Sequence, residues 1–179
     1  MSRIHDAIVF AAKKHAGQVR KGTDVPYITH PMEVMQILTS NGCLEDVIIA
    51  GILHDTLEDT DAKQEDIFEL FGENVMNIVS AESEDKSKTW KERKQATIDS
   101  LNSASIEVKQ VCFADKLSNL RSMAADKIAV GDNLWKRFNA SKEDIGWYYS
   151  QILENTDCVS SYETYDEYTE LLQQVFDLQ

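Results

Sequence analysis

One uninterrupted apolar run constrains the fold of this chain more than any other stretch. Residues 47–53 read Val-Ile-Ile-Ala-Gly-Ile-Leu, without a single polar side chain. A run of this kind is typical of an element that is buried on all sides. His54 and Asp55 follow it immediately, and Glu58 and Asp59 come shortly after. Because burying ionisable groups is costly unless something pairs with them, the stretch also marks a candidate functional site.

The spacing of these polar residues is suited to a metal site. If the run continues as a helix, His54 lies beside Asp55, and Glu58 and Asp59 follow one turn later over the same edge. An imidazole and a carboxylate at the end of a buried helix are ligands that divalent metals accept. The alternative is a helix C-terminus with solvated acids, which a His-Asp pair by itself favours. The apolar run and the partners described below make the metal site the preferred interpretation.

The composition favours helices in a single domain. The chain has 179 residues, enough for one domain with a substantial core. Only two prolines and seven glycines interrupt it, and we therefore predict an all-α fold. Asp61 with Gln64, and Ser141 with Asp144, resemble helix capping boxes. Besides the apolar run, hydrophobic periodicity predicts helices at about residues 4–16, 34–41, 64–71, 75–79, from 89 onward, 106–123, 145–152 and 162–176.

The charge and the cysteines limit the class of protein. The net charge of −13, from 18 basic and 31 acidic residues, argues against nucleic-acid binding, since phosphate backbones need clustered Lys and Arg. An anionic small ligand needs only a local basic cluster. Cys43, Cys112 and Cys158 form no CxxC pair and are interpreted as small core residues of a reduced compartment. With no signal peptide and no apolar run of membrane-spanning length, we predict a cytoplasmic protein without a membrane partner.

A second candidate ligand, His30, precedes Pro31. A residue before proline is biased away from helix, and proline suits the first turn of the helix that follows. His30 therefore stands where a loop enters a helix, a rigid place from which to direct an imidazole. The same loop carries Arg20-Lys21, the most concentrated positive charge in the first fifty residues. Taken alone, His30 is better explained as a turn residue with local hydrogen bonds.

A third candidate, Asp115, continues an apolar stripe on the predicted helix 106–123. Helical geometry places it on one face with Val108, Val111, Cys112 and Asn119. A carboxylate in such a stripe needs a metal, a cation or strong hydrogen-bond donors. The alternative is an ion pair with a Lys or Arg of a neighbouring helix.

His30, His54, Asp55 and Asp115 together form a plausible ligand set. Nitrogen and oxygen ligands without cysteine suit manganese, iron, zinc or magnesium. Four protein ligands on a metal that prefers six leave room for water and a phosphate oxygen. Such a metal lowers the pKa of water and neutralises phosphate charge. Glu58 and Asp59 are close enough in sequence to orient or deprotonate that water.

The order H…HD…D of this set resembles the HD-domain phosphohydrolases. The surrounding residues are similar to the hydrolase domain of the Rel/Spo alarmone enzymes, from about Ala11 to Arg121. Four motifs carry this resemblance: His15-x-x-Gln18-x-Arg20-Lys21-Gly22, Pro26-Tyr27-x-x-His30-Pro31, His54-Asp55-Thr56-x-Glu58-Asp59 and Ala114-Asp115-Lys116-Leu117-x-Asn119-Leu120.

The resemblance implies a fold, an activity and a metal. The expected fold is an HD-domain bundle of about eight to ten helices around one Mn²⁺ per chain, with other divalent metals as alternatives. The expected substrate is guanosine tetra- or pentaphosphate, whose 3′-diphosphate leaves as pyrophosphate to give GDP or GTP. We expect residues 1–179 to form a single hydrolase domain without a synthetase domain, which describes a stand-alone small alarmone hydrolase. The sequence predicts no oligomeric state.

The resemblance also implies residue roles. The metal ligands would be His30, His54, Asp55 and Asp115, with Glu58 and Asp59 as the catalytic pair that activates water. Asn119 would bind substrate or the water on the metal. Arg20 and Lys21 would contact substrate phosphate or stack on the base, and Lys116, Arg121 and Arg137 are further candidates for phosphate.

Two other functions agree with the same residues. One is an HD-type phosphohydrolase that acts on another nucleotide, such as a 5′-nucleotide or the 2′-phosphate of NADPH. The other is a binding module that has kept the fold without metal chemistry, although such a module needs neither the ligand set nor Glu58-Asp59.

Overall fold

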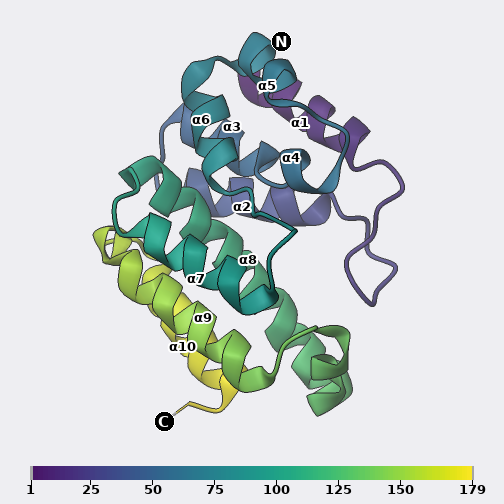
Figure 1. Ribbon diagram of the computed structural model, residues 1–179, viewed down its shortest axis with the longest axis vertical. Helices are drawn as coiled ribbons and strands as arrows, with labels where there is room; N and C mark the ends of the chain where they lie inside the picture. Colours follow the sequence, from purple (N-terminus) through teal and green to yellow (C-terminus); the bar gives the residue numbers. More distant parts are fainter. Residues whose placement is uncertain (1, 179) are drawn as a thin grey trace.

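The computed structural model describes residues 2–178 and confirms the all-α prediction (Figure 1). Within these residues, extended pairing is limited to an isolated bridge between Val19 and Pro26. The elements are α1 (Arg3–Lys14), α2 (Thr29–Ser40), α3 (Glu45–Leu53), α4 (Thr56–Asp59), α5 (Gln64–Phe71), α6 (Glu73–Ala81), α7 (Trp90–Leu101), α8 (Ile106–Val130), the 3₁₀ helix η1 (Gly131–Arg137), α9 (Lys142–Asn155), the 3₁₀ turn η2 (Asp157–Val159) and α10 (Tyr165–Phe176).

Helix α3 lies at the centre of the N-terminal half and contains the apolar run. All of residues 47–53 are buried, which confirms the prediction from their composition. The helix packs against α1, α2, α6 and α8. Its approach to α2 is close at Gly51, where an added Cβ would lie 2.4 Å from Leu38 Cδ1 and 3.1 Å from Val34 Cγ1. This contact packs the C-terminal end of α3 against the middle and the C-terminal end of α2.

The geometry of a single continuous helix does not apply to the polar residues, because the chain turns between α3 and α4. Helix α3 ends at Leu53, His54 and Asp55 form a turn, and the single-turn helix α4 begins at Thr56. The Thr56 hydroxyl donates to the Leu53 carbonyl at 2.6 Å. A side-chain hydroxyl therefore donates to a carbonyl that would accept from a backbone amide in a continuous helix.

Helix α8 is the second structural axis of the molecule. It runs seven residues beyond the predicted end at Met123 and stops at Gly131, which adopts a φ of 58°. The added segment contains three alanines and a lysine, which are good helix formers. The helix contacts α2, α3, α6, α9 and α10, and Asp115 faces this core with 5% exposure.

Two local predictions have different outcomes. Ser141 is the N-cap of α9 and accepts from the Asp144 amide at 3.0 Å, as expected. Helix α5 instead begins after Lys63, and the Asp66 carboxylate accepts from the Lys63 amide at 3.0 Å, so the cap predicted at Asp61 was wrong. Lys63 is the N-cap because the side chain of Asp66, the third residue of α5, accepts a hydrogen bond from the Lys63 amide.

The cysteine prediction holds only in part. Cys112 is buried, Cys43 is half-buried and Cys158 is exposed. All three are free thiols. None of the helices in the described part of the chain has both the length and the apolar character needed to cross a membrane.

Candidate metal centre and adjoining pocket

Four predicted ligands converge on one point from three parts of the chain. His30 stands in the first turn of α2, His54 and Asp55 form the turn after α3, and Asp115 projects from the middle of α8. His30 Nε2 lies 3.2 Å from His54 Nε2 and 3.1 Å from Asp115 Oδ1. Asp55 Oδ2 lies 3.0 Å from His54 Nε2 and 3.6 Å from His30 Nε2. The fold thus brings together residues separated by up to 85 positions.

These separations fit the coordination sphere of a small divalent cation. Ligand atoms about 2.1 Å from a metal and at right angles to each other lie roughly 3.0 Å apart. Three of the separations, 3.0, 3.1 and 3.2 Å, match this value. Imidazole nitrogen with carboxylate oxygen suits Mn²⁺, Fe²⁺ or Zn²⁺.

The outer nitrogens of both histidines are held in one tautomer. His54 Nδ1 lies 2.8 Å from the Gly51 carbonyl, which can only accept, so Nδ1 carries the proton. His30 Nδ1 lies 2.9 Å from Ser118 Oγ, and this hydroxyl donates to Glu33 Oε2 at 2.8 Å, so it accepts from His30. Each neutral ring therefore directs an unprotonated Nε2 into the cluster, as metal-ligating histidines do.

Four lone pairs directed at one point repel each other unless a cation or a proton lies between them. Burial lowers the pKa of His30. Burial also opposes protonation of His54, but the charge of Asp55 and the hydrogen bond to Asp115 outweigh it and raise the pKa of His54 well above its usual value. The cluster by itself therefore draws in a proton where a divalent metal would bind, and the residues present fit such a metal.

Three neighbouring side chains hold the two carboxylates. The Tyr27 hydroxyl donates to Asp55 Oδ2 at 2.6 Å, and Asn119 Nδ2 donates to Asp115 Oδ1 at 2.6 Å. Lys116 forms an ion pair with Asp115 Oδ2 and does not line the pocket described below. Burial works against ionisation of Asp115, but the Lys116 charge and the histidines hold its pKa well below the usual range.

Sequence reasoning gave no role to Glu33, Tyr27 or Ser118. Tyr27 stands in the same motif as His30, and Glu33 follows His30 by one helical turn, so spacing offered a weak signal for both. Ser118 is 88 residues from His30 and carried no such signal.

The acidic pair Glu58 and Asp59 lies on α4, beside the loop that joins α6 to α7. Lys86 in this loop places Nζ 3.1 Å from Asp59 Oδ1 and 3.5 Å from Glu58 Oε1, and donates to the Glu58 carbonyl at 2.9 Å. Burial raises the pKa of Glu58, and the negative charges of Asp59 and Asp55 add to this effect. Lys86 is a further residue that sequence reasoning did not associate with the site.

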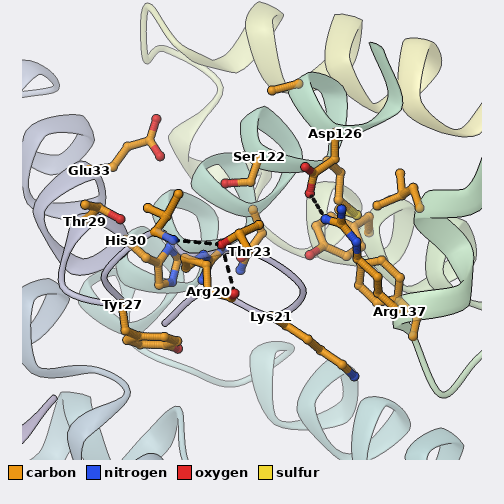
Figure 2. Close-up of a pocket in the computed structure, with 17 residues that line it drawn as sticks. Arg20, Lys21, Thr23, Tyr27, Thr29, His30, Glu33, Ser122, Asp126 and Arg137 are labelled. Carbon is orange, nitrogen blue, oxygen red and sulfur yellow. Dashed lines mark hydrogen bonds and ion pairs between the residues drawn. The ribbon is translucent and has the colours of Figure 1, made fainter. Parts of the chain in front are cut away.

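A pocket opens beside the cluster of candidate metal ligands. Its volume of about 460 Å³ is in the range of small-ligand sites. Figure 2 shows His30, Tyr27 and Glu33 at one end of it and Asp126 with Arg137 at the other. Arg20 and Asn119 line the space, and Arg20 Nη2 donates to Asn119 Oδ1 at 2.6 Å. The wall thus connects to the candidate ligand Asp115 through Asn119.

The remaining basic candidates occupy different environments. Lys21 is an exposed residue of the pocket wall. Arg137 also lines the pocket, where its Nη1 donates to Asp126 Oδ2 at 2.7 Å. Arg121 lies outside the pocket lining and forms ion pairs with Glu167 at 2.7 Å and Glu33 at 3.2 Å.

Comparison with known proteins places this architecture in a family. The HD-domain family profile matches residues 7–145. The chain is 38% identical over 125 residues to "guanosine-3′,5′-bis(diphosphate) 3′-pyrophosphohydrolase MESH1" of Drosophila melanogaster, covering 68% of this chain and 70% of that protein. It is 42% identical over 123 residues to the MESH1 protein of Xenopus tropicalis, covering 67% and 69%.

A solved structure extends the similarity along the chain. It is that of a metazoan ortholog of SpoT that hydrolyses ppGpp, with a TM-score of 0.80 and 29% sequence identity over 97% of this chain and 96% of the other. The match confirms the resemblance seen in the sequence motifs and the HD-domain helical fold. The chain therefore belongs to the HD-domain family, in the branch of the MESH1 proteins.

Proposed function

We propose that this protein is a Mn²⁺-dependent hydrolase that removes the 3′-diphosphate of guanosine tetra- or pentaphosphate as pyrophosphate, leaving GDP or GTP. The observation that carries the proposal is the junction of two features. The Nε2 atoms of His30 and His54 lie 3.0–3.7 Å from each other and from carboxylate oxygens of Asp55 and Asp115, and a pocket of about 460 Å³ has His30 in its wall. The MESH1 relatives bear the name of this activity.

The ligand set would be His30, His54, Asp55 and Asp115. When bound, the divalent metal would neutralise phosphate charge and lower the pKa of a water molecule. Glu58 and Asp59 would orient this water and accept its proton. The raised pKa of Glu58 makes it a better proton acceptor than an ordinary carboxylate.

Basic side chains of the pocket wall would hold the anionic nucleotide. Arg20 lies at the metal end through its bond to Asn119, so it is placed for phosphate. Lys21 contributes charge at the wall, and Arg137 with Asp126 closes the far end. Arg121 pairs with the carboxylates of Glu33 and Glu167, and Lys116 pairs with that of Asp115. We infer from these ion pairs that Arg121 and Lys116 support the site and do not contact phosphate directly.

The direct test is product identification. The protein is incubated with guanosine tetraphosphate and Mn²⁺, and the products are separated by anion-exchange chromatography. We expect GDP and pyrophosphate in equal amounts. Turnover of NADPH or a 5′-nucleotide in place of the tetraphosphate would assign the second hydrolase function, and nucleotide binding without turnover of any substrate would assign a binding module.

The metal assignment has its own test. His54→Ala should abolish both turnover and bound Mn²⁺, because one of four ligands is lost. His5→Ala, which changes an exposed histidine of α1, serves as the matched control and should keep both. EDTA should abolish activity, and Mn²⁺ should restore it better than Mg²⁺. Full metal occupancy in His54→Ala would show that the ligand set is wrong.

A further inference from the structure

His15, the residue that follows α1, is buried with 3% exposure although it is not a candidate ligand. Its Nδ1 lies 2.7 Å from Gln18 Oε1, and this amide oxygen can only accept, so Nδ1 carries the proton. Its Nε2 is buried and has no hydrogen-bond partner within the described residues. A buried polar atom without a partner costs stability and calls for an explanation.

Two contacts lead from this histidine to the site. On the polar side, Gln18 Nε2 donates to the Asp59 backbone carbonyl at 2.8 Å. On the ring side, His15 stacks on Tyr27 with centroids 4.8 Å apart and an interplanar angle of 29°. The Tyr27 hydroxyl in turn donates to the ligand Asp55 at 2.6 Å. His15 is thus two contacts away from both the metal cluster and the acidic pair.

Helix α4 needs external support of this kind. It contains a single turn, and its internal connection to the metal cluster is the bond from the Asp59 amide to the Asp55 carbonyl at 2.9 Å. A helix this short does not hold its own geometry, and the carbonyl at its end has no partner inside the helix. Gln18 supplies the missing donor to that carbonyl.

We propose that His15 and Gln18 are positioning residues that hold Asp59 at a set distance from the metal ligand Asp55. The polar arm, from His15 through Gln18 to the Asp59 carbonyl, orients the acid that activates water. The stacking arm, from His15 through Tyr27, orients the ligand. The assignment for Asp59 rests on the proposed function, whereas that for Asp55 concerns metal binding alone.

Two substitutions at one position separate the arms. His15→Phe keeps a ring on Tyr27 and removes the Nδ1 donor. His15→Asn keeps an N–H near the position of Nδ1 and removes the ring. We expect His15→Phe to lower kcat by about 10- to 100-fold, the effect of misplacing a catalytic group by a fraction of an ångström to 1 Å, with KM and the Mn²⁺ dissociation constant unchanged. We expect His15→Asn to keep most of kcat at saturating Mn²⁺ but to bind the metal about tenfold more weakly.

Two further variants test each arm beyond His15. Gln18→Met removes the donor to Asp59 without adding charge and should reproduce the kcat loss of His15→Phe. Its matched control is Gln64→Met, because Gln64 is an exposed glutamine on α5 that donates to Ser80. Tyr27→Phe keeps the stack and removes the bond to Asp55, so it should weaken Mn²⁺ binding as His15→Asn does.

The measurements are kcat and KM for guanosine tetraphosphate, Mn²⁺ affinity by isothermal titration calorimetry, and the melting temperature. Because His15→Phe removes an unpaired buried nitrogen, the melting temperature of this variant should not fall. If His15 had a purely structural role, the melting temperature would fall together with kcat. Equal kcat in the parent and in Gln18→Met overturns the polar arm, and this variant decides the question if His15→Phe does not fold. Unchanged Mn²⁺ affinity in His15→Asn and Tyr27→Phe overturns the stacking arm.

Failure of the proposed function is distinguishable from failure of this inference. If the parent binds Mn²⁺ but leaves guanosine tetraphosphate intact, the proposed function is wrong. The affinities of the His15→Asn and Tyr27→Phe variants then still decide whether His15 supports Asp55.

Discussion

Gly51→Ala tests whether the close packing of α2 on α3 builds the metal site. The new methyl group would lie 2.4 Å from Leu38 Cδ1 and 3.1 Å from Val34 Cγ1. Carbon atoms in contact are about 3.5–4.0 Å apart, so roughly 1 Å of additional space is needed. Leu38 and Val34 are fully buried, so neither side chain can move toward solvent. The two helices must therefore separate or distort.

The expected loss of stability follows from two opposing terms. Alanine in a helix interior is favoured over glycine by about 1 kcal/mol. Overpacking a core costs about 1–3 kcal/mol, and a contact of 2.4 Å belongs at the upper end. We therefore expect Gly51→Ala to lower the free energy of unfolding by about 2 kcal/mol.

The same displacement acts on the proposed metal ligands. His30 stands at the start of α2, His54 follows the end of α3, and their Nε2 atoms are 3.2 Å apart. The Gly51 carbonyl also accepts the bond that orients His54. Perturbing such an outer partner typically weakens metal binding by about 10- to 100-fold, and we expect Gly51→Ala to fall in this range.

The assay combines urea denaturation in EDTA with calorimetric titration of Mn²⁺. Gly146→Ala in α9 is the matched control, because its Cβ would lie 3.1 Å from Phe176 and α9 carries no ligand. Here the gain in helix propensity offsets a smaller clash, so stability should change little and Mn²⁺ affinity not at all. Adding Leu38→Ala to Gly51→Ala should restore Mn²⁺ affinity. Parental stability and affinity in Gly51→Ala would refute the packing argument.

Three further predictions concern charge. Arg20→Ala should lower kcat/KM by a factor equivalent to about 1.5–3 kcal/mol, which is the contribution of a charged hydrogen bond, and should change the melting temperature little. Added salt should raise the KM of this variant less than that of the parent. An unchanged kcat/KM at low salt would place the phosphate site elsewhere. Asp59→Asn should keep Mn²⁺ and nucleotide binding in titrations but lower kcat by about 10²–10⁴-fold, and a loss below about threefold rules out its role in proton transfer. Burial raises the pKa of Glu82 to about 7, although the charge of Lys116 opposes this shift. The folded protein therefore binds the Glu82 proton more tightly than the unfolded chain does. The stabilisation that this proton gives is lost as the pH rises from about 4.5 through 7. Glu82→Gln should therefore raise the free energy of unfolding at pH 8 by up to about 3 kcal/mol in EDTA, and by much less at pH 5.5; equal gains at both pH values would show that Glu82 is not the titrating group.

The features that could be read from the sequence are local ones. The burial of residues 47–53 followed from composition, and the adjacency of His54 and Asp55 followed from covalent connection. The start of α9 at Ser141 was recognisable because a cap and its partner lie three residues apart. Asp115 was found through helical periodicity, since a carboxylate in an apolar stripe is unusual. Each of these signals depends on residues within about three helical turns along the chain.

Other features depended on the tertiary structure because the interacting groups are far apart in sequence. The turn at His54-Asp55 forms where side chains of His54 and Thr56 bind helix carbonyls, a competition that periodicity does not report. The sequence favoured Arg20 and Lys21 but gave no means to separate Arg121 from Arg137. In the structure Arg137 lines the pocket, whereas Arg121 lies outside the lining and pairs with Glu33 and Glu167. The direction of a long side chain is decided by the partners that folding brings within about 3 Å, and the sequence alone does not contain those distances.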